Sequence, residues 1–127
     1  MPTTVKEMMD AANAMVPKVT MEEAKALMAG GNAVIVDVRD SAELAQTGTV
    51  KGALHIPRGS LEFRADATTS YHDPNLDPAK TVIIYCAAGS RAALAGKALK
   101  DMGYADVRNL GGFKDWVDAG GEIERPA

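Results

Sequence analysis

The fold of this chain is decided by the stretch Thr81-Val82-Ile83-Ile84-Tyr85-Cys86-Ala87-Ala88-Gly89-Ser90-Arg91. Its first five residues are β-branched or aromatic, which is typical of a strand buried within a sheet. The residues from Arg91 to Met102 follow a helical pattern, so residues 86–90 form a turn between a strand and a helix. In α/β sheets such turns lie at the carboxyl edge, where ligands bind. Cys86, the only cysteine of the chain, is therefore predicted to lie in a functional loop.

This loop is suited to holding anions. The first N–H groups of a helix have no partners within the helix, and they point at whatever occupies the turn before it. Positive potential at that end, together with Arg91, favours the thiolate form of Cys86. A free cysteine is often a small core residue instead, but the small side chains around Cys86 indicate a backbone that curls around a ligand. We predict Cys86 as the nucleophile and a binding loop made of Ala87, Ala88, Gly89, Ser90 and Arg91.

The remaining pattern alternates helices and strands. Thr20 and Glu23 have the spacing of a capping box, which predicts a helix that ends at Ala29 before two glycines. The apolar run 33–38 predicts a buried strand, and Asp40 or Ser41 begins a short helix. Further strands are expected at residues 54–56 and 106–109. The alternation predicts an α/β fold with a central, mostly parallel sheet and helices on both faces.

The N-terminus forms an amphipathic helix that ends near Pro17. Its apolar stripe consists of Val5, Met8, Met9, Ala12 and Val16. We divide the chain into a helical extension at residues 1–17 and a catalytic domain at residues 18–127. The stripe is expected to pack on its own domain, and a homodimer formed through this helix is the alternative.

Four motifs in this order resemble those of the rhodanese domains, a family of sulfurtransferases. They are Cys-x-x-Gly-x-Arg at residues 86–91, Asp37-Val38-Arg39, the stretch 48–57 with its His-Ile-Pro, and Gly-Gly-Phe-x-x-Trp at residues 111–116. Thr49 stands where the family usually has histidine. The resemblance extends from about Val19 to Ile123, so residues 18–127 are identified as a single rhodanese domain.

The resemblance implies a sulfurtransferase, and we expect it to use neither a cofactor nor a metal. Cys86 would take the outer sulfur of a donor such as thiosulfate, and sulfite would leave. The loop N–H groups would hold the resulting persulfide. With no second cysteine, the chain cannot release that sulfur by forming a disulfide. The acceptor must come from outside as cyanide, a small thiol or a protein thiol.

Two other readings start from the same loop. The active-site loops of cysteine-dependent phosphatases and arsenate reductases resemble Cys-x5-Arg. This chain has only four residues between Cys86 and Arg91, and this tighter loop favours transfer of a sulfur atom over binding of a tetrahedral oxyanion. A phosphatase also needs a general acid. Asp66 and Asp73 are the candidates for this role, but their spacing from Cys86 does not favour either of them. The third reading is a rhodanese-like module that only binds partners, against which the presence of Cys86 and Arg91 counts.

Polar residues near the loop receive supporting roles. Asp37 and Arg39 are expected to form buried, charge-assisted hydrogen bonds that brace the sheet. Arg58 and Arg64 could reach the pocket and attract anions, and a solvated surface charge is the equal alternative for each. Of the two, Arg58 is included among the candidate supporting residues. The pair Gly111-Gly112 is expected to make a tight turn before a helix whose Phe113 and Trp116 side chains pack in the core.

Bulk properties exclude some classes of function. The chain has 127 residues with 14 Lys and Arg against 17 Asp and Glu, and no basic stripe interleaved with aromatic residues. Nucleic-acid binding is therefore not expected. No apolar stretch approaches the length of a membrane span, and the spacing of one cysteine and two histidines predicts no metal site. A cytoplasmic location is the expectation.

Overall fold

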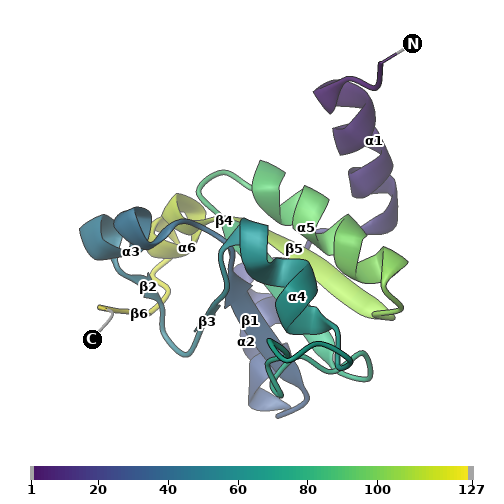
Figure 1. Ribbon diagram of the computed structural model, residues 1–127. Coiled ribbons are helices and arrows are strands. Elements are labelled where there is room, and N and C mark those ends of the chain that lie inside the picture. The colour runs from purple at the N-terminus through teal and green to yellow at the C-terminus, as the bar shows by residue number, and fades with distance from the viewer. Residues whose placement is uncertain (1, 126–127) are drawn as a thin grey trace.

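A single four-stranded parallel sheet organises the molecule. The computed structural model describes residues 2–125, and its strand order is β3-β1-β4-β5 (Figure 1). The strands are β1 (Ala33–Asp37), β3 (Leu54–His55), β4 (Thr81–Cys86) and β5 (Asp106–Gly112). All pairings within this sheet are parallel. The predicted parallel sheet is confirmed, and Cys86 is the last residue of β4.

Helices cover both faces of the sheet, as predicted. The helices are α1 (Val5–Met15), α2 (Met21–Ala29), α3 (Ser41–Thr47), α4 (Leu61–Ala65), α5 (Ser90–Asp101) and α6 (Phe113–Asp118), and a 3-10 turn, η1, spans Arg58–Ser60. Val82, Ile84 and Cys86 of β4 pack in the core beneath α4 and α5. Ile83 and Tyr85 alternate to the opposite face and pack with residues of α2 and α6.

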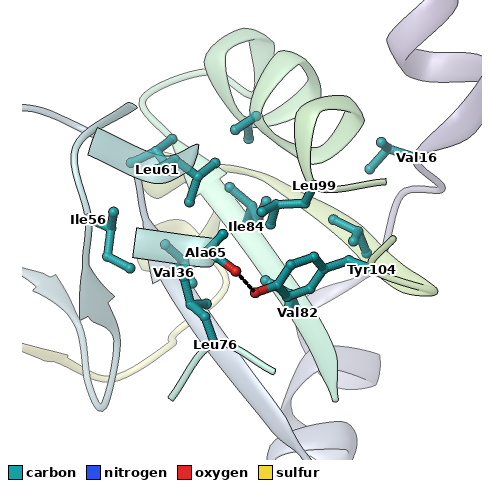
Figure 2. Close-up of a cluster of buried hydrophobic side chains, with 14 of the residues drawn as sticks. Val16, Val36, Ile56, Leu61, Ala65, Leu76, Val82, Ile84, Leu99 and Tyr104 are labelled. Atoms are coloured by element: carbon teal, nitrogen blue, oxygen red, sulfur yellow. Dashed lines mark hydrogen bonds between the residues drawn. The ribbon is translucent and has the colours of Figure 1, made fainter. Parts of the chain in front are cut away.

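Figure 2 shows the larger of the two cores, which lies between the sheet and helices α4 and α5. Leu99 of α5 and Ile84 of β4 are fully buried there. Tyr104 is also buried, and its hydroxyl donates a hydrogen bond of 2.9 Å to the carbonyl of Ala65. This bond satisfies a polar atom that would otherwise be costly to bury, and it ties the end of α4 to the segment before β5.

The first two helices begin at capping boxes. The Thr20 hydroxyl accepts a hydrogen bond from the Glu23 backbone, and the Glu23 carboxylate accepts one from the Thr20 backbone. Thr4 and Glu7 repeat this arrangement at the start of α1. The helix predicted from Thr20 to Ala29 is therefore confirmed as α2. Local hydrogen bonds of the capping box fix where this helix starts.

Two features differ from the prediction. Residues 111–112 do not form a turn before α6: β5 continues through both glycines, with a register shift opposite Ile84 and Tyr85. Gly111 has φ +96°, so the strand bends there in a conformation that favours glycine. A second, two-stranded antiparallel sheet pairs β2 (Thr49–Val50) with β6 (Ile123–Glu124), a long-range contact with no local sequence signal.

The C-terminal end of helix α1 packs against α5. Ala12 and Val16 are buried, whereas Val5 is 67% and Met8 43% exposed. A Cβ atom on Gly96 of α5 would lie 2.9 Å from the Val16 side chain, so the two helices approach closely there. The apolar stripe is thus only partly covered by its own domain, and the division of the chain at residue 17 stays a prediction. No helix among residues 2–125 is long and apolar enough to cross a membrane.

Candidate active site

Cys86 lies at the point where the sheet ends and α5 is about to begin. Its side chain is buried, and its Sγ atom accepts a hydrogen bond of 3.0 Å from the Gly89 N–H. Gly89 has φ +102°, the left-handed conformation that turns the chain back over the sulfur. Residues 87–89 therefore curl around the thiol, as the small side chains predict.

Several backbone donors of this turn are left without an acceptor among residues 2–125. In the described part of the chain, no hydrogen-bond acceptor takes the N–H groups of Ala88, Ser90, Arg91 and Ala92. These groups belong to the loop and to the first turn of α5, where N–H groups have no partner within the helix. The dipole of this helix adds positive potential at the same end. The loop can thus stabilise negative charge on or next to Sγ.

The end of β5 fixes the shape of the loop from behind. Asn109 is buried, its Nδ2 donates to the Gly89 carbonyl at 3.0 Å, and its Oδ1 accepts from the Gly111 N–H at 2.8 Å. A Cβ atom on Gly112 would lie 2.5 Å from the Ala87 carbonyl oxygen, so only glycine allows the strand to pass this close. Sequence reasoning missed Asn109, because no local pattern marks a residue that contacts the loop across the sheet.

Arg91 lies beside a carboxylate that was not anticipated. Its Nη1 and Nη2 atoms donate to the two carboxylate oxygens of Glu43 on α3, each at 2.9 Å. Hydrogen bonding from Arg91 lowers the pKa of Glu43 to about 2, against some opposition from burial. The same pair raises the pKa of Arg91, with smaller contributions from Cys86 and Asp40. The predicted anion-holding cation is therefore already engaged by a carboxylate.

Beneath the loop, Asp37 and Arg39 form a buried ion pair. The Arg39 Nη2 donates to Asp37 at 2.9 Å, and both side chains are almost fully buried. The Tyr85 hydroxyl donates to Asp37 at 2.6 Å, and Thr49 also donates to it at 3.0 Å. Burial works against the charge on Asp37, but the hydrogen bonds from Arg39 and Tyr85 outweigh it and hold the pKa of Asp37 below its usual range. The hydrogen bonds expected between Asp37 and Arg39 are confirmed.

The structure places Arg58 and Arg64 differently. Arg58 follows β3 at the carboxyl end of β1, where its N–H donates to the Val38 carbonyl. Its guanidinium pairs with Glu62 at 2.8 Å and lines a groove between α1 and α5. Arg64 is exposed on α4 and lines a separate cavity with Phe63. Neither guanidinium contacts the Cys86 loop, and the supporting role of Arg58 stays a prediction.

Asp66 and Asp73 are both engaged in the segment after α4. The Asp66 carboxylate accepts hydrogen bonds from the backbone and hydroxyl of Thr68, and the Asp73 carboxylate accepts one from the Asn75 N–H. Each side chain therefore stabilises a local turn. Among residues 2–125 there is also no group of three His, Cys, Asp or Glu side chains suited to a metal ion.

Helix α1 reaches the outer side of the loop. A groove of about 310 Å³ is lined by Met9 and Asn13 of α1 together with Ala88, Gly89 and Ser90. Cys86 does not line this groove. The N-terminal helix thus lies close enough to support the loop from outside while staying clear of the sulfur.

Known proteins with a similar sequence or structure include named sulfurtransferases. The human thiosulfate:glutathione sulfurtransferase is 33% identical over 110 residues, which cover 80% of this chain and 94% of the human protein. The thiosulfate sulfurtransferase PspE of Escherichia coli K12 is 39% identical over 80 residues, covering 63% and 70% of the two chains.

A solved structure from Rhodopseudomonas palustris, described as a protein of unknown function and possible tyrosine phosphatase, superimposes with a TM-score of 0.86. It is 40% identical and covers 98% of this chain and 99% of its own. The profile of the rhodanese-like domain family matches residues 20–119, a span that contains the parallel sheet, the Cys86 loop and the ion pair beneath it. The strand that ends in Cys86, and the helix that begins behind it, are thus parts of one rhodanese-like domain, and this chain belongs to that family.

Proposed function

We propose that this protein is a sulfurtransferase that carries sulfur as a persulfide on Cys86. The observation that carries this proposal is the position of Sγ, which accepts the Gly89 N–H at 3.0 Å in a loop whose neighbouring N–H groups have no acceptor among residues 2–125. An anionic terminal sulfur needs donors of this kind and no general acid. The names of the human and Escherichia coli relatives support the same reaction.

The reaction is a two-step cycle. The Cys86 thiolate attacks the outer sulfur of thiosulfate, a new S–S bond forms to Cys86, and the bond to the inner sulfur breaks as sulfite leaves with its electron pair. An external nucleophile, such as cyanide, a small thiol or a protein thiol, then attacks the outer sulfur and regenerates the Cys86 thiolate. Because this chemistry needs a reduced thiol, we place it in the cytoplasm, where thiols are kept reduced.

Intact-protein mass spectrometry tests the proposal directly. After incubation with thiosulfate, the protein is expected to gain the mass of one sulfur atom and to lose it when cyanide is added. Cys86 is the only cysteine, so the Cys86→Ser variant should gain no sulfur and form no thiocyanate while its circular dichroism spectrum stays unchanged. Turnover by that variant would refute the mechanism.

Phosphatase chemistry is the second candidate, because the similar Rhodopseudomonas palustris structure is described as a possible tyrosine phosphatase. The four-residue spacing between Cys86 and Arg91 and the local hydrogen bonding of Asp66 and Asp73 favour sulfur transfer. Hydrolysis of an aryl phosphate faster than transfer of sulfur to cyanide would reverse this ranking. A module that only binds partners would show neither activity.

A further inference from the structure

We propose that Glu43 determines donor specificity by neutralising Arg91, so that the Cys86 loop prefers persulfide donors of low charge to the dianion thiosulfate. This inference rests on the proposed function and names the donor class that the same site favours. Its basis is the bidentate pairing of Glu43 on α3 with Arg91 and the charges that surround this pair.

The pairing of Glu43 with Arg91 is well formed. Both carboxylate oxygens accept from the guanidinium at 2.9 Å, a bidentate geometry that is stronger than a single contact. The two side chains are about equally exposed, at 33% and 35%. An incoming anion that needs Arg91 must therefore compete with a carboxylate that is already in place.

The neighbouring charges reinforce this effect. Asp40 precedes α3, and its charge also acts on Arg91, as does that of Cys86. Arg39 acts on Glu43, but it is buried in its own pair with Asp37. Arg58, at the same edge of the sheet, is paired with Glu62. The three arginines at this edge of the sheet are therefore each paired with a carboxylate, and the backbone N–H groups of the loop are left to hold the substrate.

The backbone N–H groups can hold either donor, so the carboxylates around Arg91 decide between donors of different charge. Thiosulfate carries two negative charges toward Cys86, Glu43 and Asp40, whereas an organic persulfide on an uncharged carrier carries at most one. In that reaction the Cys86 thiolate attacks the outer sulfur of R–S–SH and forms a new S–S bond. The S–S bond of the donor breaks, R–S⁻ leaves with its electron pair, and Cys86–S–SH remains. Atoms and charge balance without an oxidant or a reductant.

The test measures how fast Cys86 gains sulfur from two donors by rapid quenching and intact mass. The donors are thiosulfate and the persulfide of N-acetylcysteine methyl ester, whose carrier is uncharged. In Glu43→Gln, the released Arg91 should lower the half-saturating thiosulfate concentration about fivefold while the limiting rate stays similar. The persulfide values should not change, and added salt should reduce the gain with thiosulfate.

Two further variants control for structural effects. Glu43→Asp keeps the charge and should restore the original preference between donors. Asp106→Asn removes a carboxylate from another half-exposed arginine pair, that with Arg108 at the opposite end of β5, and should leave both donors unaffected. Unfolding in urea establishes that each variant is folded under the assay conditions.

The outcomes separate the inference from the function on which it rests. An equal change for both donors, or a higher half-saturating thiosulfate concentration in Glu43→Gln, would overturn the specificity role while leaving sulfur transfer in place. A wild-type protein that gains no sulfur from either donor would overturn the proposed function, and this inference with it.

Discussion

Tyr85 and Cys86 are neighbours on β4, but their side chains lie on opposite faces of the sheet and differ in how their hydrogen-bonding capacity is used. The Tyr85 hydroxyl donates to Asp37 and accepts from the Val50 N–H, so its hydrogen-bonding capacity is used. The Cys86 sulfur has one backbone donor beside it and further N–H groups left open. One face of the strand is built for stability, and the other keeps donors available for chemistry.

The two faces of β4 should therefore be separable by substitution. The network beneath the sheet is buried, and each of its charges has partners, so damage there should appear as lost stability. The loop above has few internal contacts, so damage there should appear as lost activity.

Asp37→Asn should have the largest effect on stability. It leaves the Arg39 guanidinium buried without its counter-charge, which is expected to lower the free energy of unfolding by about 3–5 kcal/mol. Urea denaturation measures this change. Asp10→Asn is the matched control, because Asp10 belongs to an exposed pair with Lys6 that should contribute less than about 1 kcal/mol. Sulfur transfer per folded Asp37→Asn molecule should persist, and its complete loss would show that the two faces are coupled.

Gly112→Ala should mainly affect activity. The new Cβ atom would meet the backbone of Ala87 at 2.5 Å and of Ala88 at 3.2 Å, so the loop must move by a sizeable fraction of an ångström or more. A displacement of about 1 Å can cost about a hundredfold in rate, which sulfur transfer to cyanide would report. Gly59→Ala is the control, since its Cβ atom would meet open space. Equal rates for the two variants would show that the loop tolerates displacement.

Val16→Ala tests how α1 is anchored. Val16 is buried against α5, and losing two methyl groups there should lower the free energy of unfolding by about 2 kcal/mol. Val5→Ala, at the exposed end of the same stripe, should have almost no effect.

Deletion of the same helix also tests whether the protein is a monomer or a dimer in solution. Light scattering is expected to give the mass of one chain, and deletion of residues 1–16 should lower the melting temperature without changing that state. A dimer that the deletion converts to a monomer, or a Val5→Ala variant that dissociates, would assign the exposed part of the stripe to a subunit contact.

Acidification should produce the smallest effect. The pKa of Glu43 is lowered from 4.5 to about 2 by its bond with Arg91. The resulting stabilisation is therefore complete above pH 4.5 and disappears as the pH falls toward 2. Because both side chains are one-third exposed, solvent screening reduces this contribution to about 1 kcal/mol. Between pH 5 and about pH 2 the wild type should lose that much more stability than Glu43→Gln, and parallel curves would show that the pair contributes nothing.

The sequence predicted those parts of the molecule that local rules determine. The strand ending in Cys86 follows from its β-branched and aromatic residues, and α2 follows from the spacing of Thr20 and Glu23. The pair Asp37 and Arg39 is two residues apart at a strand end, so their contact needs no knowledge of the fold.

Contacts made across the fold escaped prediction. Glu43 and Arg91 are 48 positions apart, and Asn109 meets Gly89 only because β5 pairs with β4. A charged residue near the start of a helix, such as Arg91, is compatible with several local roles. Its pairing with Glu43 depends on where α3 lies relative to the Cys86 loop. Likewise, Gly111 and Gly112 looked like a turn because sequence shows the flexibility of glycine but not the backbone that passes beside it.

The pairing of β2 with β6 sets an order of events during synthesis. Thr49 and Val50 contact Tyr85, but their strand partner lies at residues 123–124 and leaves the ribosome after all four strands of the parallel sheet. A nascent chain that has completed the Cys86 loop therefore still has an unpaired strand edge at this corner. We expect the corner next to the buried ion pair to become fully ordered only once residues 123–124 have been synthesised, after the Cys86 loop has already formed.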